Sequence, residues 1–373
     1  MSPSLSLSNR RTRYAVVGLG HFAQVAILPA FRHARKNSEL VALISDDPVK
    51  HKRLGARYKV THHAAYDEYD DLLSSSEIDA VYIALPNSMH AEYAIRAANA
   101  GVHVLCEKPM AMNEHECRQM IEASQRGKIK LMIAYRLHFE EANLMVMEQV
   151  KKRKIGEPRF FSSVFSHSVV RGDIRTRADM GGGGLYDIGV YCINAARYLF
   201  REEPTEVFAW TANTDHRRFR GVDEVAAAIL KFSNGKFAQF TCSQGAADTS
   251  QYRIIGTKGD IQVEPAFEYA SGLAFKVTLD GKTQKKRVPK RDQIASELVY
   301  FSDCALKNRE PEPSGWEGLA DVRIIQGLYE SARTGKPVRL QRVRKSSRPK
   351  IDQKITRPPV DKPKLVHARS PSQ

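Results

Sequence analysis

The feature that most constrains this sequence is a regular alternation of short apolar runs and stretches of helical periodicity between residues 13 and 134. Apolar runs of strand length occur at 14–17, 40–45, 80–85, 103–106 and 130–134. Helical spacing follows up to residue 31 and at 50–58, 69–74, 89–100 and 114–126. Because strands separated by helices pair in parallel, we expect an α/β fold with a Rossmann-type doubly wound parallel sheet over residues 12–137.

A second pattern begins after the turn at residues 156–158. Strand-like segments now follow one another, with the hairpin signals Asn234-Gly235 and Asp280-Gly281 between them. We expect strands at 159–165, 206–212, 225–232, 237–243, 252–255, 261–264 and 275–279, and helices at 140–154, 187–198, 293–307 and 317–333. Residues 138–340 should therefore form an α+β domain with a large, mostly antiparallel open sheet, used for substrate binding and oligomerisation.

The charge of the chain is concentrated near its end. The net charge is +16, and residues 342–369 carry ten Lys or Arg against two Asp, which is half of the excess. This segment is also rich in proline, so we expect residues 341–373 to be a basic disordered tail. Deletion of the residues beyond Arg342 should then leave the fold and activity intact. A solvated tail is favoured over an anion-binding arm, and no nucleic-acid partner is expected.

Composition limits the cellular setting as well. No apolar run reaches the length of a membrane span, so no membrane partner is expected. Arg10-Arg11 is followed directly by the first strand and not by the apolar region of an export signal, which predicts a cytoplasmic protein. The five cysteines form no close pair, so we expect buried thiols and neither a disulfide framework nor a metal site.

Directly after the first expected strand lies Gly18-Leu19-Gly20-His21-Phe22-Ala23, a G-x-G-x-x-A motif. In such a turn the backbone can approach a pyrophosphate that lies on the N-terminus of the following helix. The motif alone is weak, because a tight turn without a ligand has the same sequence. Its position at the first strand of an alternating array predicts dinucleotide binding.

The second strand ends at Ser45-Asp46-Asp47, where the ribose of a bound adenosine would be recognised. An acidic residue there suits the free 2′-hydroxyl of NAD, whereas Lys50 and Tyr66 suit the 2′-phosphate of NADP. Ser45 and Asp46 are equally suited to cap the helix that follows. The residues by themselves leave both cofactors open.

Two further turns follow later strands of the expected sheet. Leu85-Pro86-Asn87-Ser88-Met89-His90 comes after the third strand, and Glu107-Lys108-Pro109 after the fourth. Open α/β sheets bind ligands at the carboxyl ends of their strands. Since Pro109 ends its strand, Lys108 is expected to project into the cleft, although a lone lysine is more often a surface residue.

In the second domain, Gly181-Gly182-Gly183-Gly184 precedes Asp187 and Tyr191, which are four residues apart and would share one face of a helix. A lysine ammonium beside a tyrosine favours the phenolate, so such a pair can act as a general acid and base. Neutral residues at the edge of the core would show the same spacing.

Taken together, the glycine turn, residues 85–90, Glu107-Lys108-Pro109 and the later Asp187-x-Gly-x-Tyr191 resemble the Gfo/Idh/MocA oxidoreductase family. The likeness runs from about residue 14 to 337 and is strongest to the branch of glucose–fructose oxidoreductase and related NADP-dependent aldose dehydrogenases. The resemblance implies that Lys108 contacts the reacting hydroxyl and the nicotinamide ribose, that Tyr191 accepts the proton, and that Asp187 orients the sugar. The cofactor-binding residues that it implies are Gly18, Gly20, His21, Phe22, Ala23, Ser45, Asp46, Lys50, Tyr66, Leu85, Pro86, Asn87, His90, Glu107, Lys108 and Arg136.

The activity implied by the resemblance is NADP-dependent hydride transfer between nicotinamide C4 and a sugar carbon. The reaction would oxidise C1 of an aldose to a lactone or reduce a carbonyl sugar, in a homodimer or homotetramer formed through the second-domain sheet. Two alternatives remain open. One is an NAD(P)-dependent dihydrodiol or other polyol dehydrogenase that exchanges its cofactor, and the other is a non-catalytic regulator that senses the dinucleotide.

Overall fold

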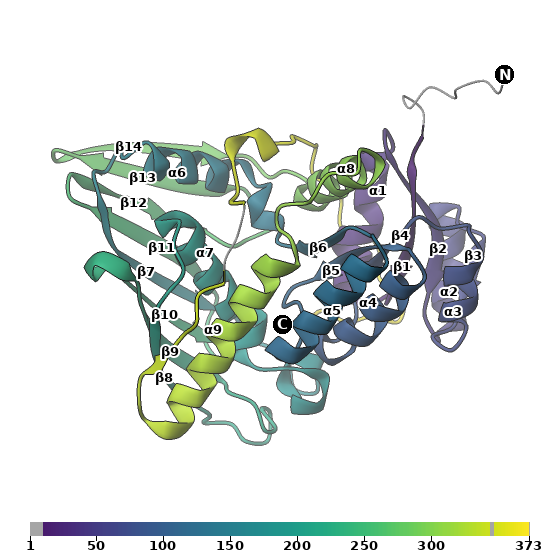
Figure 1. Ribbon diagram of the computed structural model, residues 1–373, viewed down its shortest axis with the longest axis horizontal. Helices are drawn as coiled ribbons and strands as arrows, with labels where there is room; N and C mark the ends of the chain where they lie inside the picture. Colours follow the sequence, from purple (N-terminus) through teal and green to yellow (C-terminus); the bar gives the residue numbers. More distant parts are fainter. Residues whose placement is uncertain (1–9, 344–346, 373) are drawn as a thin grey trace.

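The computed structural model describes residues 10–343 and 347–372, so most of the N-terminal segment and residues 344–346 and 373 of the tail lie outside it. Figure 1 shows two sheets, one surrounded by helices and the other larger and more open. The first sheet has six parallel strands in the order β3-β2-β1-β4-β5-β6. This confirms the expected doubly wound sheet, whose switch point lies between β1 and β4.

The elements of this first domain follow the expected alternation closely. Its strands are β1 (Thr12–Val17), β2 (Ser38–Ile44), β3 (His62–Ala64), β4 (Ala80–Ile83), β5 (His103–Glu107) and β6 (Leu131–Ala134). Its helices are η2 (Ala23–Ile27), α1 (Leu28–Ala34), α2 (Pro48–Tyr58), α3 (Tyr69–Ser74), η3 (Asn87–Met89), α4 (His90–Asn99), α5 (Glu114–Arg126) and η4 (Arg136–His138). The strand β3 was not expected, because its three residues form a short edge strand with two exposed histidines.

The second sheet has nine strands in the order β14-β13-β12-β11-β7-β10-β9-β8-β15. Only β7 and β10 pair in parallel, and the other neighbours are antiparallel. The strands are β7 (Pro158–Ser166), β8 (Glu206–Ala212), β9 (Val225–Lys231), β10 (Phe237–Ser243), β11 (Thr249–Gly256), β12 (Gly259–Val263), β13 (Leu273–Leu279), β14 (Lys282–Val288) and β15 (Val338–Arg339). The lysine-rich strand β14 was not expected, since it has little apolar patterning and obtains its pairing from the turn at Asp280-Gly281.

Burial explains why the two halves have different sequence patterns. In β4 and β6 every residue is buried, as parallel strands covered on both faces require. In β9 and β10 buried and exposed residues alternate, because one face of that sheet packs on helices and the other faces outward. The helices of this half are α6 (Glu141–Lys151), η5 (Ile174–Thr176), η6 (Ala178–Met180), η7 (Leu185–Gly189), α7 (Val190–Phe200), η8 (Ser233–Gly235), α8 (Gln293–Leu306) and α9 (Gly315–Thr334).

The boundary expected at residue 138 is not a clean division in space. Helix α8 comes late in the sequence, yet it packs on α1 and on β1 and β2 of the first sheet. Tyr14 and Ser38 both hydrogen-bond the Ser302 hydroxyl, at 2.8 and 2.7 Å. Part of the 138–340 segment therefore completes the Rossmann domain.

The expected disorder of the tail is wrong for the residues that the structure describes. Gln353, in the short helix η9 (Ile351–Gln353), is buried and donates to the Glu312 carbonyl at 3.0 Å. Further along, Val366 is only 3% exposed and packs in the cluster around β1 and α1. Sequence reasoning missed this because the apolar residues of the tail are few and isolated, so no periodic pattern marks them. Deletion beyond Arg342 is consequently not expected to be neutral.

Two smaller expectations can be compared with the structure. All five cysteines are buried and unpaired, as their spacing indicated. Within residues 10–343 and 347–372, no helix combines the length and apolar character needed to cross a bilayer.

Candidate active site

Lys108 lies at the carboxyl end of β5, where Pro109 turns the chain toward the second domain. Its ammonium Nζ donates to the Asp187 carbonyl oxygen at 2.8 Å and lies 3.5 Å from the Asp187 carboxylate Oδ1. Both side chains are 13% exposed. The expected projection of Lys108 into the cleft is therefore realised, and the contact spans 79 residues of sequence.

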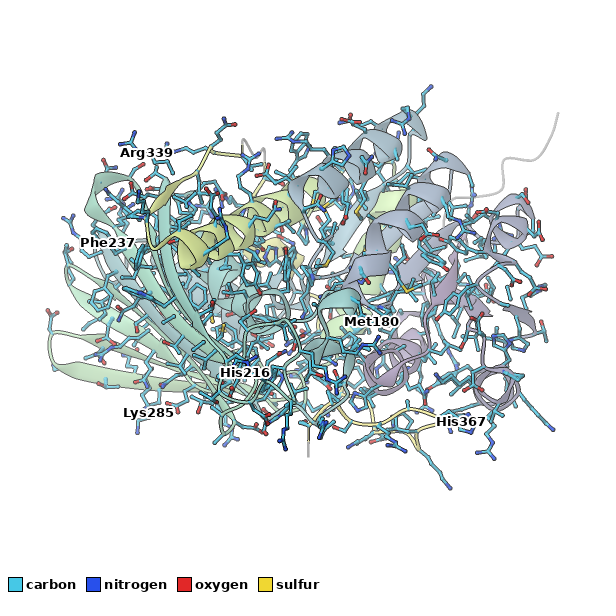
Figure 2. All side chains as sticks on the ribbon, turned by 90° about the horizontal axis from the view of Figure 1, so that it is seen from below. Met180, His216, Phe237, Lys285, Arg339 and His367 are labelled. Carbon is cyan, nitrogen blue, oxygen red and sulfur yellow. The ribbon has the colours of Figure 1, made fainter. Side chains whose placement is uncertain are left out.

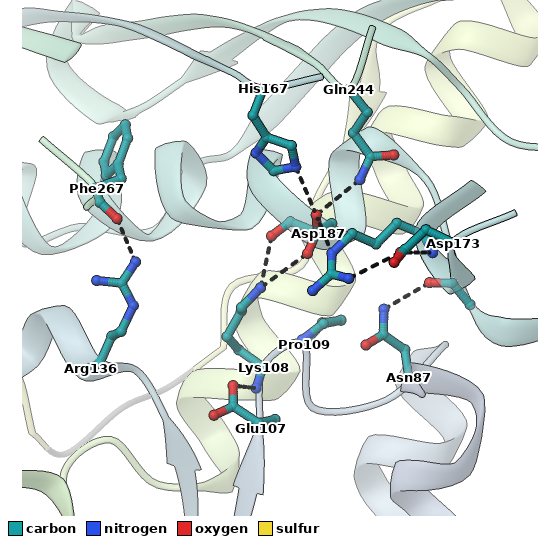
Figure 3. Close-up of polar contacts among 12 residues, drawn as sticks. Asn87, Glu107, Lys108, Pro109, Arg136, His167, Asp173, Asp187, Gln244 and Phe267 are labelled. Carbon is teal, nitrogen blue, oxygen red and sulfur yellow. Dashed lines mark hydrogen bonds and ion pairs between the residues drawn. The ribbon is translucent and has the colours of Figure 1, made fainter. Parts of the chain in front are cut away.

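Asp187 is surrounded by donors from separate segments, as Figure 3 shows. Its Oδ2 accepts from Arg175 Nε at 3.1 Å and from Gln244 Nε2 at 2.9 Å, and His167 Nε2 lies at 3.7 Å. Burial by itself would raise the pKa of Asp187, but the charges of Arg175, Lys108 and His167 hold that pKa well below its usual range. Asp187 is accordingly a fixed anion.

Tyr191 shares this cluster with two cations. Lys108 Nζ lies 4.8 Å from the centre of the Tyr191 ring, and the Arg136 guanidinium carbon lies 5.0 Å from it. Arg136 is buried and donates to the Phe267 carbonyl and, at 2.7 Å, to Gln293 Oε1. The chain winds as a π-helix over Leu185–Gly189 and as an α-helix from Val190, so the single α-helix expected from 187 is replaced by two elements. Such π-helical turns are frequent at functional sites.

The glycine turn has the geometry that its motif predicts. Gly18 has φ +92°, and a Cβ there would lie 2.6 Å from the Ala84 carbonyl oxygen. A Cβ on Gly20 would meet nothing within 4 Å, so the turn has free space in front of it. The Phe22 ring packs edge-on against the Tyr269 ring of the second domain, with 5.6 Å between the ring centres, and Ala23 is buried. These residues suit the close approach of a phosphate group to the backbone.

At the adenosine end of the expected site, the residue that caps α2 is not one of the two that the sequence suggested. Asp47, and neither Ser45 nor Asp46, caps α2 by accepting from the backbone N–H groups of Val49 and Lys50 at 2.9 and 3.2 Å. Asp46 is exposed and its Oδ1 accepts from the Tyr66 N–H at 2.9 Å, which joins the loops after β2 and β3. Sequence spacing suggested the wrong cap because three polar residues in a row satisfy the same pattern.

The turn after β4 connects the two domains. Asn87 Nδ2 donates to the Gly181 carbonyl at 2.7 Å. His90 is fully buried, and its two ring nitrogens lie 2.9 and 3.0 Å from the carbonyls of Pro109 and Leu85. His90 therefore holds the two turns together, and a contact of this residue with a cofactor stays a prediction. Pro86 is the residue before the short helix η3.

Glu107 precedes Lys108 and is the last residue of β5. Its Oε1 accepts from the Tyr82 hydroxyl at 2.8 Å. Burial raises the pKa of Glu107, while the charge of Lys108 opposes that rise. The residue supports the turn that presents Lys108.

Sequence reasoning missed three residues of the cluster, namely His167, Arg175 and Gln244. They lie in the segments that follow β7 and β10 and in η5, and they converge only on Asp187. No local motif surrounds them, so the only available signal was the expectation that a buried carboxylate needs compensating charges.

Fold and site together define an oxidoreductase class that is built on a dinucleotide-binding Rossmann sheet. The model of the oxidoreductase family with an NAD-binding Rossmann fold matches residues 12–135, and that of the Gfo/Idh/MocA C-terminal domain matches residues 144–262. The chain belongs to the Gfo/Idh/MocA oxidoreductase family, as the motifs indicated.

Individual relatives agree with this membership. The chain is 32% identical over 335 residues to D-xylose 1-dehydrogenase [NADP(+)] of Haloarcula marismortui, covering 88% of this chain and 93% of that protein. It is similar to the crystal structure of aldose-aldose oxidoreductase from Caulobacter crescentus complexed with glycerol, with 35% identity, a TM-score of 0.84, and coverage of 89% of this chain and 100% of that one. The 3-ketoreductase KijD10 from Actinomadura kijaniata, in complex with NADP and TDP-benzene, matches at 27% identity and a TM-score of 0.79, covering 86% and 98%.

Proposed function

We propose that this chain is an NADP-dependent sugar oxidoreductase that moves a hydride to or from a sugar carbon. The observation that carries the proposal is the contact of Lys108 with both Asp187 and the Tyr191 ring at the carboxyl end of β5. It brings an ammonium, a carboxylate and a phenol together at the edge of a Rossmann sheet where a dinucleotide binds.

The residues of the glycine turn fit a dinucleotide. Gly18 permits the close turn, the space before Gly20 is open, and the buried His21 Nε2 has no hydrogen-bond partner among the described residues. Gly18 to Ala23 would hold the pyrophosphate, and Lys108 and Arg136 would lie at the nicotinamide end. When bound, NADP supplies the acceptor or donor of the hydride.

Each residue of the cluster then has a defined role. The Tyr191 hydroxyl takes the proton from the sugar hydroxyl in oxidation and returns it in reduction. Lys108 stabilises the negative charge that develops on both oxygens. Asp187 fixes the Lys108 ammonium and accepts from a sugar hydroxyl, because Arg175 and Gln244 keep it ionised and oriented.

The relatives that act on sugars with NADP support the choice of cofactor. At the adenosine end, Lys50 lies on the first turn of α2 and the half-buried Tyr66 lies on the next loop. Both suit a 2′-phosphate, and the N-terminus of α2 adds a favourable dipole. Asp46 is the opposing charge at this position.

The proposal is tested with the purified protein and a panel of aldoses and ketoses, each assayed with NADP and with NAD by the absorbance of the reduced nicotinamide. We expect reduction of NADP by at least one aldose, with a lactone as product. No nicotinamide reduction or oxidation with any sugar would contradict the proposal.

A second candidate substrate is a trans-dihydrodiol. The small pocket beside Lys108 and Tyr191 is otherwise lined by Tyr135, Leu137, Val190 and Asn194, and most of its lining is apolar. A trans-1,2-dihydrobenzene-1,2-diol dehydrogenase of Danio rerio is 31% identical over 248 residues. The same assay with a dihydrodiol distinguishes the candidates by kcat/KM. The combination of Lys108, Asp187 and Tyr191 argues against a regulator without catalysis.

We also propose a cytoplasmic homodimer or homotetramer that forms through the outer face of the second sheet. Large apolar side chains are exposed there, with Trp210 at 61% and Phe237 at 45%. Phe160 and Phe237 are paired in register on adjacent strands, so exposed apolar surface extends across these two strands. Trp210→Lys with Phe237→Lys should convert the oligomer to a monomer in light scattering, and a wild-type monomer would contradict the proposal.

A further inference from the structure

The end of the chain lies across the glycine turn. Gln24, the residue after the motif, pairs with the backbone of Val366 in both directions, because its Nε2 donates to the Val366 carbonyl and its Oε1 accepts from the Val366 N–H, each at 2.8 Å. The same Nε2 donates to the Leu19 carbonyl inside the turn at 3.0 Å. Gln24 is fully buried. The tail is therefore joined to the backbone of the turn through one side chain.

Further contacts carry residues 361–372, which we call the strap, from one end of the expected dinucleotide site toward the other. On α2, Arg57 Nη1 donates to the Lys364 carbonyl at 2.8 Å, and His367 Nδ1 lies 2.9 Å from the cap carboxylate of Asp47. The Val170 N–H of the second domain then donates to the Pro371 carbonyl at 2.7 Å. Figure 2 shows this segment running past the Rossmann helices, with His367 labelled.

The charges around the turn fit an anion beneath the strap. The buried His21 Nε2 has no hydrogen-bond partner in the described part of the chain. Burial lowers the pKa of His21, and the nearby charges of Arg175 and Lys362 lower it further. An unsatisfied nitrogen thus lies in the residue next to Gly20, and the space in front of Gly20 is open. A pyrophosphate is the group that such donors bind at a helix N-terminus.

We infer that the strap forms the outer wall of the dinucleotide site. The Gln24–Val366 pair and the Val170–Pro371 contact must open before the nucleotide leaves. The inference rests on the dinucleotide binding of the proposed function. In many enzymes the opening of such a segment limits the rate of product release. The strap therefore retains NADP between turnovers.

The test measures the release rate of NADPH, followed by its fluorescence after mixing with excess NADP. A chain that ends at Val360 keeps the contact of Gln353 and the hydrogen bond from the Ser296 hydroxyl to the Ile355 carbonyl, but it lacks the strap. It should release NADPH about tenfold faster or more. Val366→Asp, which puts a charge at the buried anchor, should act in the same direction. Lys362→Ala removes one positive charge of the strap and should raise the rate about threefold, with a larger effect at low salt, because NADPH is an anion.

Lys285→Ala on β14 is the matched control, since it removes an exposed cation at the far end of the second sheet and should leave the rate unchanged. If the shortened chain and Val366→Asp both release NADPH at the wild-type rate, the strap does not cover the nucleotide. Tighter and faster NADPH binding by the shortened chain would also overturn the inference, because the tail would then occupy the place of the nucleotide. A wild-type protein that binds no NADPH would instead overturn the proposed function.

Discussion

The two ends of the site hold their charges in different ways. At the reacting end, Asp187 is enclosed by Lys108, Arg175, Gln244 and His167 from four separate segments. At the adenosine end, the exposed Asp46 contacts one backbone N–H, and Asp47 caps a helix at the surface. Buried charges interact strongly and are costly to disturb, whereas exposed ones are screened. We therefore expect substitutions around Asp187 to have large effects on activity, and substitutions near Asp46 to change the preference between NADP and NAD by small free energies.

The strongest test of the reacting end removes its two catalytic candidates. Lys108→Ala and Tyr191→Phe should each lower turnover by roughly two to four orders of magnitude, the usual range for acid–base groups. NADPH fluorescence titration should show that the nucleotide still binds. The double variant should lose little more than either single variant, and fully additive losses would show that the two residues do not act together.

Removing the main partner of Asp187 should change the pH profile. Arg175→Ala removes the cation that contributes most to lowering the pKa of Asp187, so that pKa should rise. Activity that needs the ionised carboxylate is lost as the pH falls through its pKa, and the acid limb of kcat/KM should therefore move to higher pH. Stability should fall by about 1–3 kcal/mol, because the Asp187 carboxylate loses a hydrogen-bond donor.

Arg177→Ala is the control for that experiment. Arg177 lies two residues further along and pairs with Asp179 at the surface. The Arg177→Ala variant should leave both the pH profile of kcat/KM and the unfolding temperature unchanged. An equal shift in both variants would show that loop structure, and not the charge on Asp187, sets the acid limb.

Glu297 on α8 sharpens the comparison, because it is a buried carboxyl near the reacting end without the partners of Asp187. Neither carboxyl oxygen has a hydrogen bond among the described residues, and burial together with the charge of Glu107 raises the pKa of Glu297 well above its usual value. A raised folded pKa costs stability as the pH rises above the unfolded value. Glu297→Gln should therefore stabilise the protein by about 1–2 kcal/mol at pH 8 and by little at pH 4.

The measurement is thermal unfolding across that pH range, with Glu330→Gln as a control at an exposed position of α9. A gain that does not grow with pH would mean that folding does not raise the pKa of Glu297.

The smallest effects are expected at the adenosine end. Asp46→Asn keeps an acceptor for the Tyr66 N–H but removes the charge, so the preference for NADP over NAD should widen by about three- to tenfold. Lys50→Ala should narrow it by a similar factor, and Lys52→Ala, one residue past His51 on the exposed side of α2, should not change it. Dissociation constants for both nucleotides provide the measurement. Tighter binding of NAD than NADP by the wild type would indicate that Asp46 contacts the ribose hydroxyl.

Sequence patterns predicted the strands whose burial is periodic. They failed for strands that form only because a neighbouring strand pairs with them. The buried parallel strands and the alternating strands β8 to β10 were predicted because burial on two faces or on one leaves a distinct period. The charged strand β14 and the three-residue β3 have no such period and exist because a neighbouring strand pairs with them. Likewise, Lys108, Asp187 and Tyr191 lie in motifs, while His167, Arg175 and Gln244 are recognised only by their common contact.

By itself, the sequence determined the Rossmann sheet, the glycine turn, the family and the position of Lys108 at a strand end. These depend on local periodicity and on residues close together in the chain. Only the tertiary structure decided which groups surround Asp187, that α8 joins the first sheet, that Asp47 is the helix cap, and that the basic tail packs over the turn. Those outcomes depend on contacts between distant segments, such as Gln24 and Val366, which are 342 residues apart in the chain. Burial and charge pairing provide the free energy that stabilises these contacts, and no local sequence pattern records them.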